Sequence, residues 1–169
     1  GNNAYNYFQA STSFVFTELI PENAILNYGK FRLNYAEVGS SAPFNALADQ
    51  YVKPTAFGSV PLFGIPGTKN NDNLLPERTK SYEIGMELTF LDGRAAFDVN
   101  YFNSETVDQI IPVAVSTATG FSSKYVNAGT VENKGWELTL TGTPVKSGSF
   151  KWDISVNWTR IRNQVTELY

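Results

Sequence analysis

The sequence predicts an all-β protein built from antiparallel strands in up-and-down order, and three observations lead to this fold class. Apolar and polar residues alternate without interruption over residues 81–90 and again over residues 150–159. Because the side chains of a strand point to opposite faces in turn, each run is a strand with one apolar and one polar face. Each run is about ten residues long, which is what a tilted strand needs to cross the hydrocarbon of a bilayer. Short and long connections alternate between the expected strands, as they do in transmembrane β-barrels.

The composition agrees with a barrel wall. Charged residues make up 17% of the 169 residues, below the share of about 25% that is usual in soluble domains. The mean hydropathy of -0.22 resembles that of a soluble protein, because alternation averages the two faces of each strand. A net charge of -3 with scattered basic residues argues against a nucleic-acid partner. The absence of cysteine and histidine excludes disulfides, thiolate chemistry and Ser-His or Cys-His catalysis.

Six strands are expected, and each is defined by apolar residues at every second position. Their approximate ranges are 8–17, 25–38, 79–91, 94–103, 134–141 and 149–161. The alternating apolar pairs that define them, in the same order, are Phe14 and Phe16, Phe31 and Leu33, Ile84 and Met86, Phe97 and Val99, Trp136 and Leu138, and Trp152 and Ile154.

The connections between these strands differ in length. A short link around Pro21-Glu22-Asn23 joins the first two strands, and another around Pro144 and Gly148 joins the last two. Asp92-Gly93 is a strong hairpin signal because both turn positions need a positive φ. The remaining links, about 39–78 and 104–133, are long. Short turns on one side and long loops on the other are typical of outer-membrane barrels, whose long loops lie outside the cell.

No group of side chains indicates an enzyme. Glu83 and Glu87 share a face, but four residues along a strand separate them by roughly 13 Å, beyond the ~5–9.5 Å between the two carboxyl groups of glycosidases. Glu105 and Asp108 lie in a segment without the spacing of a calcium-binding loop. We therefore expect no catalytic residue, no cofactor and no metal ligand, and interpret these carboxylates as groups that face water.

Aromatic residues are the candidate ligand contacts. Trp136, Trp152 and Trp158 could stack on sugars, but they share the apolar face of their strands, which favours the aromatic girdle of a membrane barrel. Aromatic residues in the long loops are the better candidates for substrate binding, because loops with rings and polar neighbours suit glycans or peptides. The alternative, that these rings pack the loops against each other, stays open. The loop candidates are Phe44, Tyr51, Phe57, Phe63, Phe121 and Tyr125.

Four stretches of sequence carry a family resemblance. Residues 73–85, NLLPERTKSYEIG, resemble the "LKPE…S.E.G" stretch of TonB-dependent outer-membrane receptors. Asp92-Gly93-Arg94 leading into Tyr101-Phe102-Asn103 is also similar to these receptors. Residues 30–39, KFRLNYAEVG, and residues 127–137, NAGTVENKGWE, resemble the "KLR.SYG.VG" and "NAG.I.NKG.E" stretches of SusC/RagA-like transporters of Bacteroidetes.

The resemblance extends over about residues 7–168 and implies a larger protein. Such transporters have a barrel of about 22 strands with a plug domain in its lumen, and a segment that contacts TonB. Residues 1–169 would then be a partial barrel domain of six consecutive strands, without the plug or the TonB-contacting segment. The implied function is uptake of an oligosaccharide or peptide across the bacterial outer membrane. The implied partners are a SusD-like surface lipoprotein, outer-membrane lipid and, through other parts of the protein, TonB.

A second hypothesis is a soluble β-sandwich that binds carbohydrate. In that fold the apolar faces of the strands would meet in a shared core instead of facing lipid. The two hypotheses differ in one observable property, which is whether the apolar rows are buried against one another.

Overall fold

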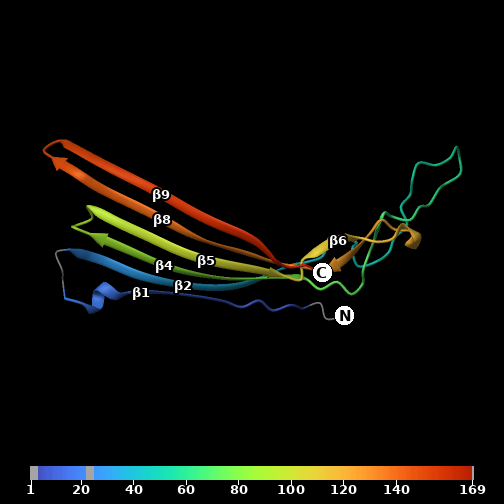
Figure 1. The fold of residues 1–169 in the computed structure, drawn as a ribbon, viewed down its shortest axis with the longest axis horizontal. Coiled ribbons are helices and arrows are strands. Elements are labelled where there is room, and N and C mark those ends of the chain that lie inside the picture. The colour runs from blue at the N-terminus through green and yellow to red at the C-terminus, as the bar shows by residue number, and fades with distance from the viewer. Residues whose placement is uncertain (1–3, 22–24, 169) are drawn as a thin grey trace. The chain divides into compact units, whose positions relative to one another are not determined.

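The computed structural model describes residues 4–21 and 25–168, and the elements assigned there are strands and two short 3-10 helices. The described residues form a six-stranded sheet in the order β1-β2-β4-β5-β8-β9 and a three-stranded sheet in the order β3-β7-β6 (Figure 1). None of the described helices has the length and hydrophobicity of a membrane-spanning helix. The elements are β1 (Gln9–Val15), η1 (Phe16–Leu19), β2 (Leu26–Ser40), β3 (Thr68–Lys69), β4 (Glu77–Phe90), β5 (Ala95–Val107), β6 (Ile110–Ala114), η2 (Thr117–Thr119), β7 (Ser123–Asn127), β8 (Thr130–Ser147) and β9 (Phe150–Glu167).

The chain divides into two compact units. The first comprises the described residues within 1–38, 80–105 and 132–164, and holds most of the six-stranded sheet. The second comprises the described residues within 39–79, 106–131 and 165–169, and holds the three-stranded sheet.

The six-stranded sheet follows chain order, which makes it an up-and-down sheet as predicted. β1 and β2 are antiparallel, with Phe14 opposite Phe31 on the apolar face. On the polar face, the Ser11 hydroxyl donates a hydrogen bond of 2.6 Å to Asn34 Oδ1. Because neighbouring strands alternate in direction, the short turns lie at one end of the sheet. The long connections, 41–76 and 108–129, leave from the other end, which we call the long-connection end.

The turn between β4 and β5 is the predicted hairpin. Three of its residues have a positive φ, whereas the sequence predicted two. Leu91, Asp92 and Gly93 have φ angles of 55°, 55° and 79°. Asn27 on β2 holds this turn, since its Oδ1 accepts a hydrogen bond of 2.6 Å from the Asp92 backbone N–H. The predicted link at Glu22 and Asn23 lies outside the described residues.

Five of the six strands of the large sheet are longer than predicted, whereas β1 is shorter than the predicted range 8–17 because Phe16 begins the 3-10 helix η1. β8 and β9 each have 18 residues, and both run well past the apolar alternation that indicated them. The connection predicted over residues 104–133 also contains strands, because β5 continues to Val107 and both β6 and β7 lie within it. Backbone pairing needs no apolar face, so the ladder continues where the sequence pattern fades.

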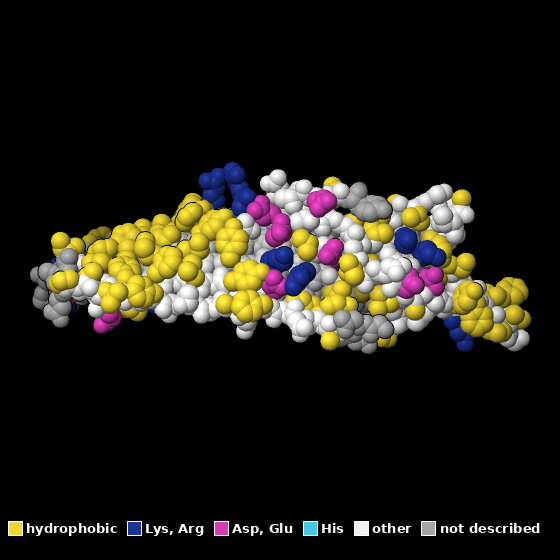
Figure 2. All heavy atoms as spheres, turned by 90° about the horizontal axis from the view of Figure 1, so that it is seen from below, with side chains coloured by type: hydrophobic (Ala, Val, Ile, Leu, Met, Phe, Trp, Pro, Cys, Tyr) yellow, Lys and Arg dark blue, Asp and Glu magenta, His cyan; other side chains and the backbone are white. Residues whose placement is uncertain are grey.

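The apolar face of the six-stranded sheet is uncovered. Ile84 is 41% exposed, Trp152 is 52% exposed and Val156 is 50% exposed. Among the described residues the buried apolar side chains are Ala46, Leu74 and Ala128, and all of these belong to the second unit. Figure 2 shows hydrophobic side chains, in yellow, gathered over the sheet. This exposure contradicts the soluble β-sandwich, in which the apolar rows would form a shared core.

Candidate functional site

Charged side chains on the polar face of the sheet form a ladder across three strands. Lys30 Nζ on β2 lies 2.7 Å from Glu87 Oε2 on β4. Arg32 on β2 places Nη1 3.5 Å from Glu87 Oε2 and Nη2 2.7 Å from Asp98 Oδ1 on β5. Two cations and two carboxylates therefore balance, and each side chain is between 25% and 39% exposed. Such a face is hydrophilic but carries no net charge at this point.

Gly85 on β4 allows Arg32 to reach past one strand to the next. A Cβ at Gly85 would lie 2.9 Å from Arg32 Nε and 2.7 Å from Asn100 Oδ1, closer than real Cβ contacts permit. The guanidinium of Arg32 therefore passes over the backbone of β4 at the only residue type without a side chain. This glycine leaves room for the cross-strand ion pair, and a Cβ at this position would require the Arg32 and Asn100 side chains to shift.

The second unit contains a groove of about 290 Å³ between the two long connections. Tyr51 and Phe121, both predicted as substrate contacts, line it from different connections. Its remaining lining residues are Asp49, Gln50, Ile65 and Pro66. Tyr51 is 77% exposed, so its ring is available to a ligand. Two rings with a carboxylate beside them can stack on a sugar or hold the side chain of a peptide.

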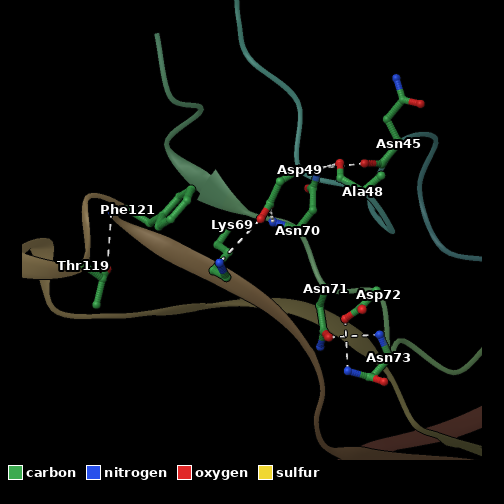
Figure 3. A network of polar contacts seen from close by, with 10 residues as sticks. All are labelled: Asn45, Ala48, Asp49, Lys69, Asn70, Asn71, Asp72, Asn73, Thr119 and Phe121. Atoms are coloured by element: carbon green, nitrogen blue, oxygen red, sulfur yellow. Dashed lines mark hydrogen bonds and ion pairs between the residues drawn. The ribbon is translucent and has the colours of Figure 1, made fainter.

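Lys69 joins the two walls of this groove. Its ammonium group lies 3.4 Å from Asp49 Oδ2 and 5.0 Å from the centre of the Phe121 ring (Figure 3). The other oxygen of Asp49 accepts a hydrogen bond of 3.0 Å from the backbone N–H of Asn70. The carboxylate is thus held at both oxygens, and the cation sits between it and an aromatic face, as cation–π attraction favours.

Backbone pairing brings the two long connections together. β3 and β7 are parallel, with Thr68 opposite Ser123. Ser122 donates a backbone hydrogen bond of 2.8 Å to the Gly67 carbonyl. Asn70 Nδ2 adds hydrogen bonds of 2.7 Å and 2.5 Å to the carbonyls of Asn45 and Ala48 (Figure 3). This framework fixes the backbone on both sides of the Tyr51–Phe121 groove.

The other predicted loop contacts lie apart from the groove lining. Phe57 forms an isolated bridge with Val60 and is 81% exposed, while Phe63 is 70% exposed. Phe44 is 94% exposed. Tyr125 lies on β7, where its carbonyl accepts a hydrogen bond of 3.1 Å from Asn71 Nδ2. The sequence reasoning missed Asp49 and Lys69, because nothing in their local pattern indicates that a ring 52 residues further on meets Lys69.

Aromatic rings form two groups on the apolar face of the sheet, one at β2 and one across β4, β5 and β8. Phe8 and Tyr35 have ring centres 6.2 Å apart. The centres of Tyr82 and Tyr101 are 6.3 Å apart, and those of Tyr101 and Trp136 are 4.9 Å apart. Trp158 lies on β9 and is 49% exposed. The aromatic girdle predicted for Trp136, Trp152 and Trp158 stays a prediction. In the described part of the chain, no three side chains of the metal-binding types gather into a metal site.

Comparison with known protein families identifies the family to which this chain belongs. The sequence matches the family described as "TonB dependent receptor-like, beta-barrel" over residues 1–167. The chain belongs to this family. The predicted resemblance to TonB-dependent receptors, and to their SusC and RagA members, is confirmed.

Individual relatives support the same conclusion. The chain is 30% identical over 142 residues to TonB-dependent receptor P26 of Formosa agariphila, covering 82% of this chain and 14% of that protein. It is 31% identical over 99 residues to TonB-dependent receptor SusC of Bacteroides thetaiotaomicron, covering 58% of this chain and 10% of that protein. Among solved structures, the RagAB peptide transporter has a TM-score of 0.84 and 22% identity, covering 96% of this chain and 18% of that one. The chain therefore spans less than a fifth of the length of these relatives and shares the barrel fold with the last.

Proposed function

We propose that this chain forms part of the wall and outer mouth of a TonB-dependent nutrient importer in the bacterial outer membrane. The observation that carries the proposal is the division of the sheet into an exposed apolar face and a charged polar face. In a barrel wall the apolar face meets lipid and the polar face meets the wet lumen. Residues 1–169 then act as a partial barrel domain, and the segments near 39–78 and 104–133 lie outside the cell.

The Tyr51–Phe121 groove is the proposed contact for the imported nutrient, an oligosaccharide or a peptide. The two rings support stacking on a sugar, and the Asp49–Lys69 pair supports recognition of charged or polar groups on a peptide. The groove lies within the second unit, which comprises the long connections. No catalytic step is proposed, since members of this family transport their substrates.

The proposed partners act on the whole transporter. A SusD-like surface lipoprotein would cover the outer mouth that the long connections form. TonB would supply energy through parts of the protein beyond this chain. The support for the lipoprotein partner is the similarity to proteins named SusC and RagAB.

The test of transport uses the full-length protein in its own host. Cells that lack its gene, and cells complemented with it, are given fluorescent peptides and fluorescent oligosaccharides, with and without TonB. We expect uptake of one of the two classes to require both the protein and TonB. Uptake that is unchanged by removal of the protein, for both classes, would refute the proposal, as would recovery of the protein outside the outer-membrane fraction.

The same assay tests the groove. Tyr51→Ala and Phe121→Ala each remove a ring, which should weaken substrate binding by about 0.5–1.5 kcal/mol, or roughly 2- to 12-fold. Leu47→Ala is the matched control, because Leu47 is half exposed in the same connection but does not line the groove. If all three variants take up limiting substrate as fast as the wild type, the groove does not bind the substrate. The proposal that the protein is an importer would still stand.

A further inference from the structure

Two lysines lie opposite each other in the three-stranded sheet. β3 and β7 are parallel, with Thr68 opposite Ser123 and Lys69 opposite Lys124. Residues opposite each other in paired strands point to the same face, and the first pair shows this directly because Thr68 Oγ1 lies 2.9 Å from Ser123 Oγ. Since side chains alternate along each strand, Lys69 and Lys124 share the other face. Their Cα atoms are about 4.8 Å apart, the spacing of neighbouring strands, and we call these residues the lysine pair.

The lysine pair carries more positive charge than the nearby carboxylate balances. Asp49 Oδ2 lies 3.4 Å from Lys69 Nζ. Within residues 4–21 and 25–168, Lys124 has no ion-pair partner. Lys124 lies on β7, the central strand of its sheet, so it does not stand on an unpaired edge. Like charges directly opposite each other destabilise a sheet, and a second anion beside Asp49 would relieve that repulsion.

The lysine pair adjoins the Tyr51–Phe121 groove. Figure 3 shows Lys69 between Asp49 and Phe121, and its ammonium group lies 5.0 Å from the centre of the Phe121 ring. Asp49 and Phe121 both line the groove. The Tyr51 ring, on the facing connection, is 77% exposed and so presents an open aromatic surface. A ligand that fills the groove therefore meets an open ring and, beside it, an ammonium group.

Backbone donors at the end of β3 are already used within the chain. Peptides that bind a sheet in extended form hydrogen-bond to the backbone groups of an edge strand. The Asn70 N–H donates a hydrogen bond of 3.0 Å to Asp49 Oδ1, and the Asn71 N–H donates one of 2.9 Å to the Ala46 carbonyl. Residues of the first long connection thus take the place that a peptide strand would need.

The edge at β6 also lacks a row of donors. The Ile110 N–H donates a hydrogen bond of 2.9 Å to Glu77 Oε1. Pro112, two residues further along the strand, has no N–H. A strand that adds to an edge uses every second N–H, and two successive ones are missing here. Both edges of the sheet therefore disfavour an extended peptide and favour a ligand that binds through its rings and charges.

We propose that the imported nutrient is an acidic oligosaccharide built from uronic acids, whose carboxylates bind the lysine pair while a sugar ring stacks on Tyr51. The carboxyl group of a uronic acid is attached directly to the sugar ring, a short spacing that suits a groove in which Lys69 lies 5.0 Å from the Phe121 ring centre. A carboxylate accepts hydrogen bonds at both oxygens, so one group can bind both ammonium groups. This inference rests on the proposed function, because it names the class of nutrient that the same groove receives.

The experiment measures ligand binding to the purified full-length transporter by isothermal titration calorimetry. The probes are oligogalacturonate, oligoglucuronate and oligomannuronate, the carboxyl-reduced form of each, and oligoglutamate as an acidic peptide. We expect at least one uronate to bind. Its carboxyl-reduced form should bind about fivefold more weakly or worse, because an exposed charge pair contributes up to about that factor.

Four substitutions separate recognition of charge from folding. Lys124→Gln should weaken uronate binding by about fivefold, whereas Lys124→Arg should keep it. Asp49→Asn removes the carboxylate that competes for Lys69 but keeps an oxygen that accepts the Asn70 hydrogen bond. Uronate binding by this variant should become about two- to fivefold tighter, which a loss of folding would not produce. Lys53→Gln is the matched control, because Lys53 is exposed in the connection that contains Asp49 but lies outside β3 and β7.

Other results overturn the inference. Equal binding of a uronate and its carboxyl-reduced form would show that the charge is not recognised. Equal losses in Lys124→Gln and Lys53→Gln, or no loss in either, would exclude the lysine pair as the site. Weaker uronate binding by Asp49→Asn would show that Asp49 and Lys69 act only as part of the framework, and a preference for oligoglutamate would identify an acidic peptide instead. A transporter that imports neutral oligosaccharides or peptides but binds no uronate would refute this inference alone, whereas import of neither class would refute the proposed function.

Discussion

A charge at Ile84 tests the proposal that the apolar face of the sheet meets lipid. Ile84 is the eighth of the 14 residues of β4, so it lies near the middle of the strand, and its side chain is 41% exposed on the apolar face. A lysine on the lipid face at the bilayer midplane costs about 2–4 kcal/mol. We therefore expect Ile84→Lys to lower the free energy of unfolding of the full-length protein by that amount, in urea titrations with phospholipid vesicles.

The neighbouring residue provides the matched control. Glu83 lies at the same depth but on the polar face, and its hydrogen bond from Asn34 Nδ2 is long, at 3.4 Å. Glu83→Lys introduces the same side chain toward the lumen, and we expect it to cost about 1 kcal/mol or less. Ile84→Leu, which keeps the volume, should cost less than about 1.5 kcal/mol. Equal costs for lysine at the two positions would refute the assignment of the faces.

Two further outcomes concern the charge ladder and the long connections. Gly85→Ala places a Cβ 2.9 Å from Arg32 Nε, and Asp98→Ala removes the partner of Arg32. In a double-mutant cycle, the losses in free energy of unfolding should fall short of additivity by about 1 kcal/mol, because both changes weaken the same ion pair. Strict additivity would show that Arg32 does not need the space that Gly85 leaves. Asn127→Ala removes three side-chain hydrogen bonds of 2.8 Å to the backbone near residues 75 and 108. Amide hydrogen exchange over 108–129 should then become about tenfold faster or more, and unchanged exchange would contradict this role.

The strand core was predictable because one face of the sheet is apolar and the other is polar. Where an apolar row faces lipid and a polar row faces water, every second residue carries the information, as in residues 81–90. At the ends this constraint disappears. β8 begins at Thr130 and β9 continues to Glu167, yet their terminal residues show no consistent apolar side. Hydrogen bonds between the backbones of paired strands hold these parts, and such bonds leave no trace in the side-chain pattern.

The sequence predicted Tyr51 and Phe121 as candidate ligand contacts, but it did not predict that both line one groove. Tyr51 and Phe121 meet because β3, a strand of two residues, pairs with β7 across a separation of 55 residues. A pairing this short has no periodicity to detect, and it depends on the tertiary arrangement of both connections. Gly85 illustrates the same limit inside a strand, since its position on the polar face was evident from sequence but the Arg32 side chain passing over it was not.

Collision accessibility of spin labels along β4 tests the central claim most directly. Single cysteines at each position of 81–90 in the full-length transporter, labelled and placed in bilayers, report contact with oxygen dissolved in lipid and with a water-soluble nickel complex. The even-numbered positions, such as Ile84 and Met86, should contact oxygen, and the odd-numbered positions, such as Glu83 and Glu87, should contact nickel, in strict alternation. Protection of the even-numbered positions from both reagents would show that this row packs inside a protein core and would contradict the account.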